Sequence, residues 1–231
     1  MQYILLIILF ILIINYIQGK HFKPCKNCLP NELHYIDIDP LPWSLVELLT
    51  QTIQMDGTHL NPDRNFGNAQ GKKLNYYQLP REITDFYLRS SYRQLVSDAV
   101  QENVDFADET EKYRIFSRMY DNENDFLDWH YDNNFTMGNR YTLVIPILQD
   151  VNNTSEFMIK DRKTQTERVV PIPAGKGVIY NGSVTYHKIS NQTEGNRRLV
   201  MIVTFYSNYN KSILGNIREI VRNLTYKILT L

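Results

Sequence analysis

The spacing of hydrophobic residues changes near residue 105. Before that point, apolar residues recur at helical spacing in two segments, Trp43 to Met55 and Arg81 to about Val104, and Pro80 stands where the second helix would begin. After it, short runs rich in β-branched and aromatic residues are separated by turn residues, which predicts strands. The predicted strands are Tyr113 to Tyr120, Phe126 to His130, Tyr141 to Leu148, Glu156 to Ile159, Arg168 to Val170, Gly177 to Tyr180, Val184 to Ile189 and Arg198 to Tyr206.

Seven or eight short strands at this spacing predict a mostly β architecture with bracing helices (α+β), either a sandwich or a jelly roll. Asn181-Gly182 is a strong signal for a tight turn between two of the strands. Gly57 to Lys73 is rich in Gly, Asn, Pro and Asp and is expected to be a loop. Ile213 to Leu229 closes the chain as a predicted amphipathic helix.

The N-terminus carries an unbroken apolar run from Tyr3 to Ile14, which extends to Ile17. At about 1.5 Å per residue such a helix reaches roughly 22 Å, less than the ~30 Å of a bilayer core. Residues 1–19 are therefore expected to be a signal peptide or a short signal anchor that contacts the membrane through residues 3–17 if it is not cleaved. Residues 20–80 are expected to form a stalk, loop and helical lead-in, and residues 81–231 the main domain, with its core at 113–206.

The compartment follows less directly from the sequence. Lys20, Lys23 and Lys26 follow the apolar run, and in a retained anchor they would place the domain in the cytosol. Seven Asn-x-Ser/Thr sequons, where chance gives roughly two or three, favour the secretory pathway with a lumenal or membrane-anchored glycoprotein. The Cys25–Cys28 pair is expected to be a small disulfide loop or a pair of linker thiols, because a lone CxxC without a thioredoxin-like setting is neither a redox site nor a full zinc site.

Composition excludes several classes of function. The chain of 231 residues with 43% hydrophobic content suffices for one core, and its formal net charge of zero gives no reason to expect a nucleic-acid partner. The glycines do not have the spacing of a dinucleotide or phosphate-binding loop, and there is no Gly-x-Ser-x-Gly elbow. The sequence does not indicate an oligomeric state.

One constellation carries chemistry. His130 and Asp132 follow an apolar run at a spacing that, on a strand, directs both side chains to one face. His187 lies on a second predicted strand, so two imidazoles and a carboxylate can meet as the facial triad of an Fe(II) oxygenase. Arg198 begins a third apolar strand, where a buried guanidinium is costly unless it meets an anion such as a carboxylate.

These motifs resemble the 2-oxoglutarate/Fe(II)-dependent dioxygenase superfamily, particularly its prolyl 4-hydroxylase-like branch. The matching pieces are ordered along the chain and cover somewhat under half of it: Phe126-Leu-Asp-Trp-His130-Tyr-Asp132, the strand from Arg140, Pro173-Ala-Gly175-Lys-Gly-Val-Ile-Tyr180-Asn-Gly, His187 and Gly195-Asn-Arg197-Arg198-Leu. The resemblance implies a double-stranded β-helix of the jelly-roll or cupin-like kind. It also implies decarboxylation of 2-oxoglutarate to succinate, coupled to hydroxylation of an unactivated C–H bond.

The resemblance maps the catalytic iron ligands onto His130, Asp132 and His187 and the cation for the cosubstrate carboxylate onto Arg198, with Arg197 as the neighbouring candidate. Its implied cofactor is Fe(II), with 2-oxoglutarate and dioxygen as cosubstrates and ascorbate as a further reductant that the family admits. The pattern departs where family members often place a tyrosine late on the strand after the His-x-Asp, because this chain has Pro146 and Ile147 there. Tyr120 on the preceding strand is the substitute candidate, with a core aromatic as the alternative reading.

Three hypotheses follow. The main one is a hydroxylase of a protein or peptide, with proline as the first target and lysine as the second. Another keeps the oxygenase chemistry but makes the substrate a small molecule, a lipid or a nucleobase. The last is a non-catalytic jelly-roll binding module at a membrane. Dependence of succinate release on the intact triad distinguishes the enzymes from the binding module.

Overall fold

A computed structural model describes residues 32–60, 69–134, 136, 138–150, 155–161, 163–208 and 210. The predicted N-terminal apolar segment, Cys25, Cys28 and the predicted C-terminal helix lie outside these ranges. Within them, no helix is long and apolar enough to cross a membrane.

The described chain is a curled antiparallel jelly roll with three α-helices on one side. Its helices are α2 (Trp43–Asp56), α3 (Arg81–Tyr87) and α4 (Ser90–Val100), with a 3₁₀ turn at Tyr76–Gln78. Its strands are β1 (Leu33–Asp37), β2 (Thr58–Leu60), β3 (Ala69–Leu74), β4 (Asp105–Phe106), β5 (Ile115–Tyr120), β6 (Phe126–His130), β7 (Arg140–Gln149), β8 (Phe157–Lys160), β9 (Glu167–Val169), β10 (Lys176–Asn181), β11 (Tyr186–Ile189) and β12 (Arg198–Tyr206).

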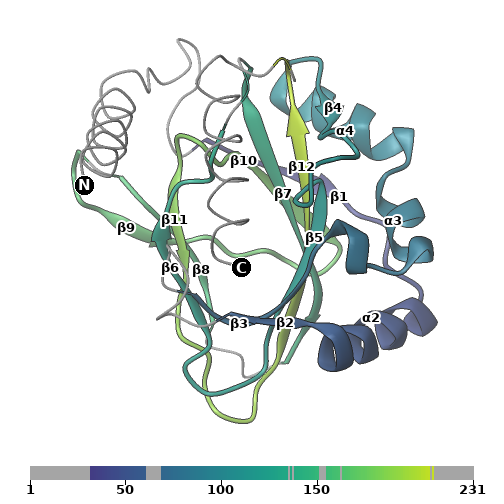
Figure 1. Cartoon of the computed structure of the whole chain (residues 1–231). Coiled ribbons are helices and arrows are strands. Elements are labelled where there is room, and N and C mark those ends of the chain that lie inside the picture. Colours follow the sequence, from purple (N-terminus) through teal and green to yellow (C-terminus); the bar gives the residue numbers. More distant parts are fainter. Residues whose placement is uncertain are drawn as a thin grey trace, which may run out of the picture.

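Hydrogen bonding orders the strands β1-β10-β7-β12-β5-β3-β6-β11-β8-β9. The larger wall of the roll comprises β1, β10, β7, β12 and β5, and the smaller wall comprises β6, β11, β8 and β9 (Figure 1). Strand β3 joins the two walls, because its residues Lys72–Leu74 pair with β5 and Ala69–Gln70 pair with β6. The fold is therefore the predicted mostly β jelly roll with bracing helices.

Alternation along the strands of the larger wall separates two hydrophobic layers. On β12, Leu199, Met201 and Val203 face the helices, where they pack with residues such as Leu49 and Ile83. The alternate residues of the same strands point into the roll, where they meet side chains from the smaller wall. This inner cluster contains Phe116, Tyr120, Val144, Phe157, Ile159, Val170, Val178, Tyr180, Ile189, Val200 and Ile202.

The eight strands predicted after residue 105 are all present, with ends that differ by at most two residues. The prediction of one helix from Arg81 to about Val104 was wrong in its extent. The chain breaks at Leu88 and Arg89, where Arg89 is extended (φ −74°, ψ 149°), and α4 starts afresh at Ser90. The Arg89 guanidinium packs over the rings of Phe86 and Tyr92, which fixes the corner between the two helices.

The expectation of a loop at Gly57 to Lys73 was also wrong in part, because β2 and β3 form there. Ala69-Gln-Gly-Lys-Lys-Leu has little intrinsic strand preference, and β3 owes its conformation to partners on both edges. Leu33–Asp37, expected in a stalk, pairs with β10 at the edge of the larger wall. Three segments between residues 32 and 80, namely β1, β2 and β3, are thus strands of the jelly roll, and α2 lies between β1 and β2 in the chain.

Candidate active site

The two histidines predicted as metal ligands lie on neighbouring strands of the smaller wall. His130 ends β6, His187 lies in β11, and the two residues are direct partners in the antiparallel ladder. Asp132 lies two residues beyond His130, and its Oδ1 is 3.8 Å from His130 Nε2 and 3.9 Å from His187 Nε2. One ligand atom from each of the three residues lies within 4.8 Å of the other two. The structure therefore brings the three predicted residues together.

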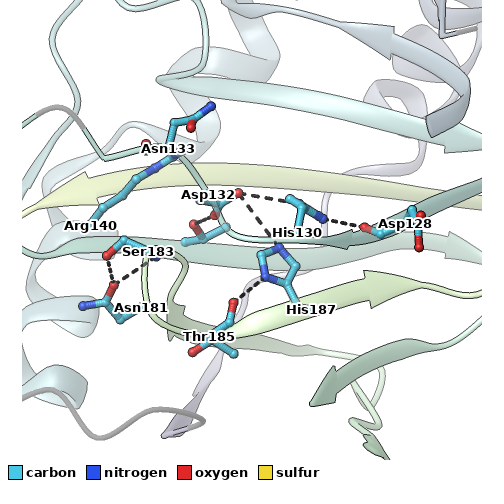
Figure 2. A network of polar contacts seen from close by, with 10 residues as sticks. Asp128, His130, Asp132, Asn133, Arg140, Asn181, Ser183, Thr185 and His187 are labelled. Carbon is cyan, nitrogen blue, oxygen red and sulfur yellow. Dashed lines mark hydrogen bonds and ion pairs between the residues drawn. The ribbon is translucent and has the colours of Figure 1, made fainter. Parts of the chain in front are cut away.

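The orientation of both imidazole rings is set by backbone carbonyls. His130 Nδ1 lies 2.7 Å from the Asp128 carbonyl oxygen, and His187 Nδ1 lies 2.9 Å from that of Thr185 (Figure 2). Because a carbonyl only accepts hydrogen bonds, each Nδ1 must carry the proton. Each Nε2 then keeps its lone pair, and both are directed towards Asp132. This is the tautomer that a metal ion requires from a histidine ligand.

Asp132 is positioned by two other segments. Thr142 Oγ1 on β7 donates to Asp132 Oδ2 over 2.6 Å, and the Asp132 amide donates to the Gly182 carbonyl over 2.8 Å. A Cβ placed on Gly182 would lie 2.0 Å from Asp132 Oδ2, so the turn after β10 can pass this close only with glycine. With Oδ2 engaged by Thr142, Oδ1 remains as the metal-facing oxygen.

The charge states of the three side chains also suit a metal ion. Burial, together with the neighbouring His187, lowers the pKa of His130 to about 3, and burial lowers the pKa of His187. Burial alone would raise the pKa of Asp132, but the charge of Arg140 and the two histidines, with the Thr142 hydrogen bond, hold it below its usual value. Two neutral imidazoles and one carboxylate are therefore present at neutral pH.

This donor set fits a divalent transition metal in general and Fe(II) in particular. Two histidines and one carboxylate on one side of an ion leave further coordination positions open to small ligands. A structural zinc site would instead be closed by a fourth protein ligand. Among the described residues, no fourth His, Cys, Asp or Glu joins the group.

The candidate residues for the cosubstrate carboxylate differ in their surroundings. Arg198 is 3% exposed, begins β12 directly opposite Tyr120 on β5, and shares the inner face with Tyr120 and Val200. Its Nη1 donates to the Ser155 carbonyl over 2.8 Å, its Nε has no hydrogen-bond partner, and no described carboxylate forms an ion pair with it. A buried guanidinium in this state is suited to receive an anion.

Arg197 points elsewhere. Its side chain is about half exposed, and its Nε lies 3.6 Å from Asp150 Oδ2, so its charge is already balanced at the surface. The sequence left the choice between Arg197 and Arg198 open, and the geometry favours Arg198, with Tyr120 beside it.

The sequence expectation for the His-x-Asp segment needs one correction. His130 and Asp132 were expected on one strand, but β6 ends at His130, and the pairing with β11 is irregular between His187 and Ile189. Asp132 is carried by the segment after the strand and held there by Thr142 and Gly182. Trp129 stacks on Tyr186, with ring centroids 5.4 Å apart, and Tyr131 packs on the same ring.

Three supporting residues were missed by the sequence analysis. Thr142 and Arg140 were only part of an apolar strand, with no motif to distinguish them. Gly182 was recognised as a turn residue, but its importance is the close approach of Asp132.

Comparisons with known proteins place the fold. No family model matches the sequence, and no curated protein matches it by sequence. Solved structures do match. The chain is similar to the non-haem α-ketoglutarate-dependent epimerase SnoN from nogalamycin biosynthesis, with 12% identity over 75% of this chain and 76% of that one and a TM-score of 0.55.

Two further structures show the same likeness. EctD from S. alaskensis, solved with 2-oxoglutarate and 5-hydroxyectoine, has 8% identity over 80% of this chain and 79% of its own, with a TM-score of 0.53. The viral collagen prolyl hydroxylase of Paramecium Bursaria Chlorella virus-1, solved with 2-oxoglutarate, has 13% identity over 75% and 96%, with a TM-score of 0.50. At these identities the likeness concerns the fold, and the chain has the fold of the 2-oxoglutarate/Fe(II) oxygenases with the His-x-Asp…His triad present.

Gly182→Ala is expected to weaken metal binding at least about tenfold, because the new methyl group displaces the Asp132 carboxylate. Anaerobic titration with Mn(II), followed by electron paramagnetic resonance, measures the affinity. Gly175→Ala is the matched control: its φ of +73° makes alanine cost about 1 kcal/mol of stability, but it has open space and lies apart from Asp132. Equal affinities in both variants would contradict the role given to Gly182.

Thr142→Val is expected to lower the affinity for Mn(II) by about 10–100-fold, since Asp132 Oδ2 loses its hydrogen bond and the carboxylate can rotate. Thr142→Ser keeps the hydroxyl and should restore most of the affinity. If valine and serine behave alike, the hydroxyl does not position the carboxylate.

Proposed function

We propose that this protein is an Fe(II)- and 2-oxoglutarate-dependent oxygenase that hydroxylates its substrate. The observation that carries the proposal is the pair of neutral imidazoles whose Nε2 atoms face the ionised Asp132. The buried and uncompensated Arg198 on the inner face of the same roll supports it. A metal site alone would serve many purposes, whereas a metal site and a buried cation within the same roll suit a cosubstrate that chelates metal and carries a second carboxylate.

The residues divide the work between them. Bound Fe(II), together with 2-oxoglutarate and dioxygen, supplies the oxidising chemistry that attacks an unactivated C–H bond. His130, Asp132 and His187 would hold the ion from one side, and their hydrogen bonds to Asp128, Thr185 and Thr142 keep the donor atoms in place. Arg198 would bind the distal carboxylate of the cosubstrate, with the Tyr120 phenol beside it.

The inner cluster contributes by excluding water. Phe157 and Tyr180 pack against the His187 ring, with centroids 5.8 and 4.9 Å away, and both are almost fully buried. Exclusion of water protects a reactive site from side reactions and strengthens the electrostatic interactions within it.

For the substrate, we propose a peptidyl residue, proline first and lysine second. The likeness in fold to a viral collagen prolyl hydroxylase supports a peptide substrate. The likeness in fold to SnoN, from nogalamycin biosynthesis, and to EctD, solved with 5-hydroxyectoine, supports the alternative of a small-molecule substrate. Incubating the enzyme with proline-containing peptides and detecting a gain of one oxygen atom by mass spectrometry tests the first choice.

Anaerobic addition of Fe(II) and 2-oxoglutarate to the purified protein is expected to give the weak visible charge-transfer band of a chelated 2-oxo acid. His187→Ala should lose the band because it loses a ligand. Arg198→Gln should raise the 2-oxoglutarate concentration needed for half of the band by at least about tenfold. Arg197→Gln, the neighbouring substitution at an ion-paired surface residue, should leave it unchanged. A folded, iron-loaded protein that gives no band would favour the non-catalytic binding module.

We further propose that the chain enters the secretory pathway through its N-terminal apolar segment. Asn181 is a poor glycan acceptor, because it is 6% exposed and its Oδ1 accepts hydrogen bonds from the amide and hydroxyl of Ser183. The expectation of glycosylation therefore rests on the other six sequons. Expression in eukaryotic cells should yield a product whose mass falls on deglycosylation, and removal of residues 1–19 should abolish that fall. A full-length product without glycans would contradict a lumenal domain.

A further inference from the structure

A second pair of cations faces the interior of the jelly roll. Arg118 lies on β5 between Phe116 and Tyr120, which belong to the inner cluster, so the alternation of the strand directs Arg118 to the same face. Lys73 on β3 is the direct partner of Arg118 in the antiparallel ladder. Directly opposed residues place their side chains on one face about 5 Å apart at Cβ. Two like charges are thus held side by side, an arrangement that is destabilising by itself.

Neither cation is balanced by a carboxylate of the part of the chain that the structure describes. Nη1 of Arg118 is buried and has no hydrogen-bond partner among the described residues, and its guanidinium lies over the Phe116 ring, 5.9 Å from the ring centre. Lys73 Nζ lies 3.5 Å from the Tyr113 hydroxyl and 5.0 Å from the centre of that ring. Among the described residues, neither forms an ion pair. Lys72, its chain neighbour, shows the ordinary arrangement, because its Nζ lies 3.1 Å from Asp121 Oδ2.

The charge of Arg118 affects the pKa values of Lys73 and of the two histidines. Burial lowers the pKa of the Lys73 ammonium, and the charge of Arg118 lowers it further. The positive charge of Arg118 also reaches His130 and His187, where it adds to the lowering of their pKa values. Arg118 is therefore within electrostatic reach of the proposed metal ligands, and Lys73 shares the inner face with it as its direct ladder partner.

The cosubstrate does not account for this charge. A divalent ion with Asp132, and a dianionic 2-oxoglutarate with Arg198, together make a neutral assembly. Arg140, a further buried cation near the ligands, also lies within the field of Glu111. Lys73 and Arg118 then remain as excess positive charge inside the roll. Uncompensated buried charge is costly, and an anionic ligand removes that cost.

We propose that Lys73 and Arg118 form a subsite for an anionic group, a carboxylate or a phosphate, on the substrate that is oxidised. The planar guanidinium can donate to two oxygens of one such group, and the ammonium can donate to an oxygen of the same group from another side. The assignment of the anionic group to an oxidised substrate rests on the proposed function, whereas the anion subsite itself rests on the positions of Lys73 and Arg118. It restricts the substrate to an acid, or to a peptide with an acidic group near the target residue.

The test uses the full metal-free protein in an Arg198→Gln background, which removes from the measurement the buried cation assigned to the cosubstrate. Sodium phosphate or sodium acetate is added, with sodium chloride at equal ionic strength as the reference, and the midpoint of thermal unfolding is measured. We expect at least one of the two anions to raise the midpoint by roughly 2–4 °C over chloride. The anion that does so identifies whether the subsite prefers a phosphate or a carboxylate.

Additional Arg118→Gln or Lys73→Gln should abolish this rise, whereas additional Arg81→Gln should not, because Arg81 is an exposed cation on α3 paired with Asp85. Without added anion, Arg118→Gln should not lower the midpoint, because it removes a partly buried charge that has no ion pair among the described residues. No rise with either anion, or a rise that persists in Arg118→Gln and Lys73→Gln, would overturn the subsite.

A second measurement assigns the anion to substrate or cosubstrate. In otherwise wild-type protein, Arg118→Gln should change the 2-oxoglutarate concentration for half of the charge-transfer band by less than about threefold. A loss of tenfold or more would mean that the pair binds the cosubstrate, and would overturn the substrate assignment. If the wild type shows no band at all, the proposed function fails, but the anion titration in metal-free protein remains readable.

Discussion

The direct pairing of His187 with His130 across the β11–β6 ladder is the constraint on which the site depends. Residues so paired have fixed separation and a shared face, so the two imidazoles meet without any flexible segment between them. Each ring is then turned by a carbonyl of its own segment, two residues before it in sequence. The geometry of the two nitrogen donors is thus mostly a property of the backbone, and only the carboxylate needs support from elsewhere.

That support explains why the two walls of the roll must close. Asp132 follows the end of β6 in the smaller wall, but its fixed oxygen is held by Thr142 and its amide by Gly182, which both belong to the β7–β10 region of the larger wall. Strand β3 joins the walls at their other side by pairing with both β5 and β6. A change in how the walls meet would therefore move the carboxylate relative to the histidines. The geometry of the candidate metal site thus depends on the closure of the whole roll.

The sequence predicts the strands after residue 105 well because each has a hydrophobic run bounded by turn residues, and it predicts the triad because the spacing and strand positions are local features. It failed at β3, whose residues have no strand pattern and whose conformation comes from partners distant in the chain. Thr142 could not be distinguished for a related reason: its role depends on facing Asp132, which only the paired walls bring about. The choice between Arg197 and Arg198 was open because the sequence does not show which face a residue near a strand end points to. In the structure the Arg198 side chain is buried and that of Arg197 is half exposed.

Overall charge gave no indication of the chemistry inside. The chain has 25 basic and 25 acidic residues, which argues against a polyanionic partner at its surface, yet Arg118 and Arg198 on the inner face form no ion pair with the described residues. Formal neutrality is an average over a solvated surface and constrains the inner face hardly at all. The inner face of β5 and β3 carries more positive charge than a cosubstrate alone requires. Selection of the substrate then depends on strand residues with fixed backbone positions, and a rigid cation pair discriminates by charge more sharply than a loop that can rearrange.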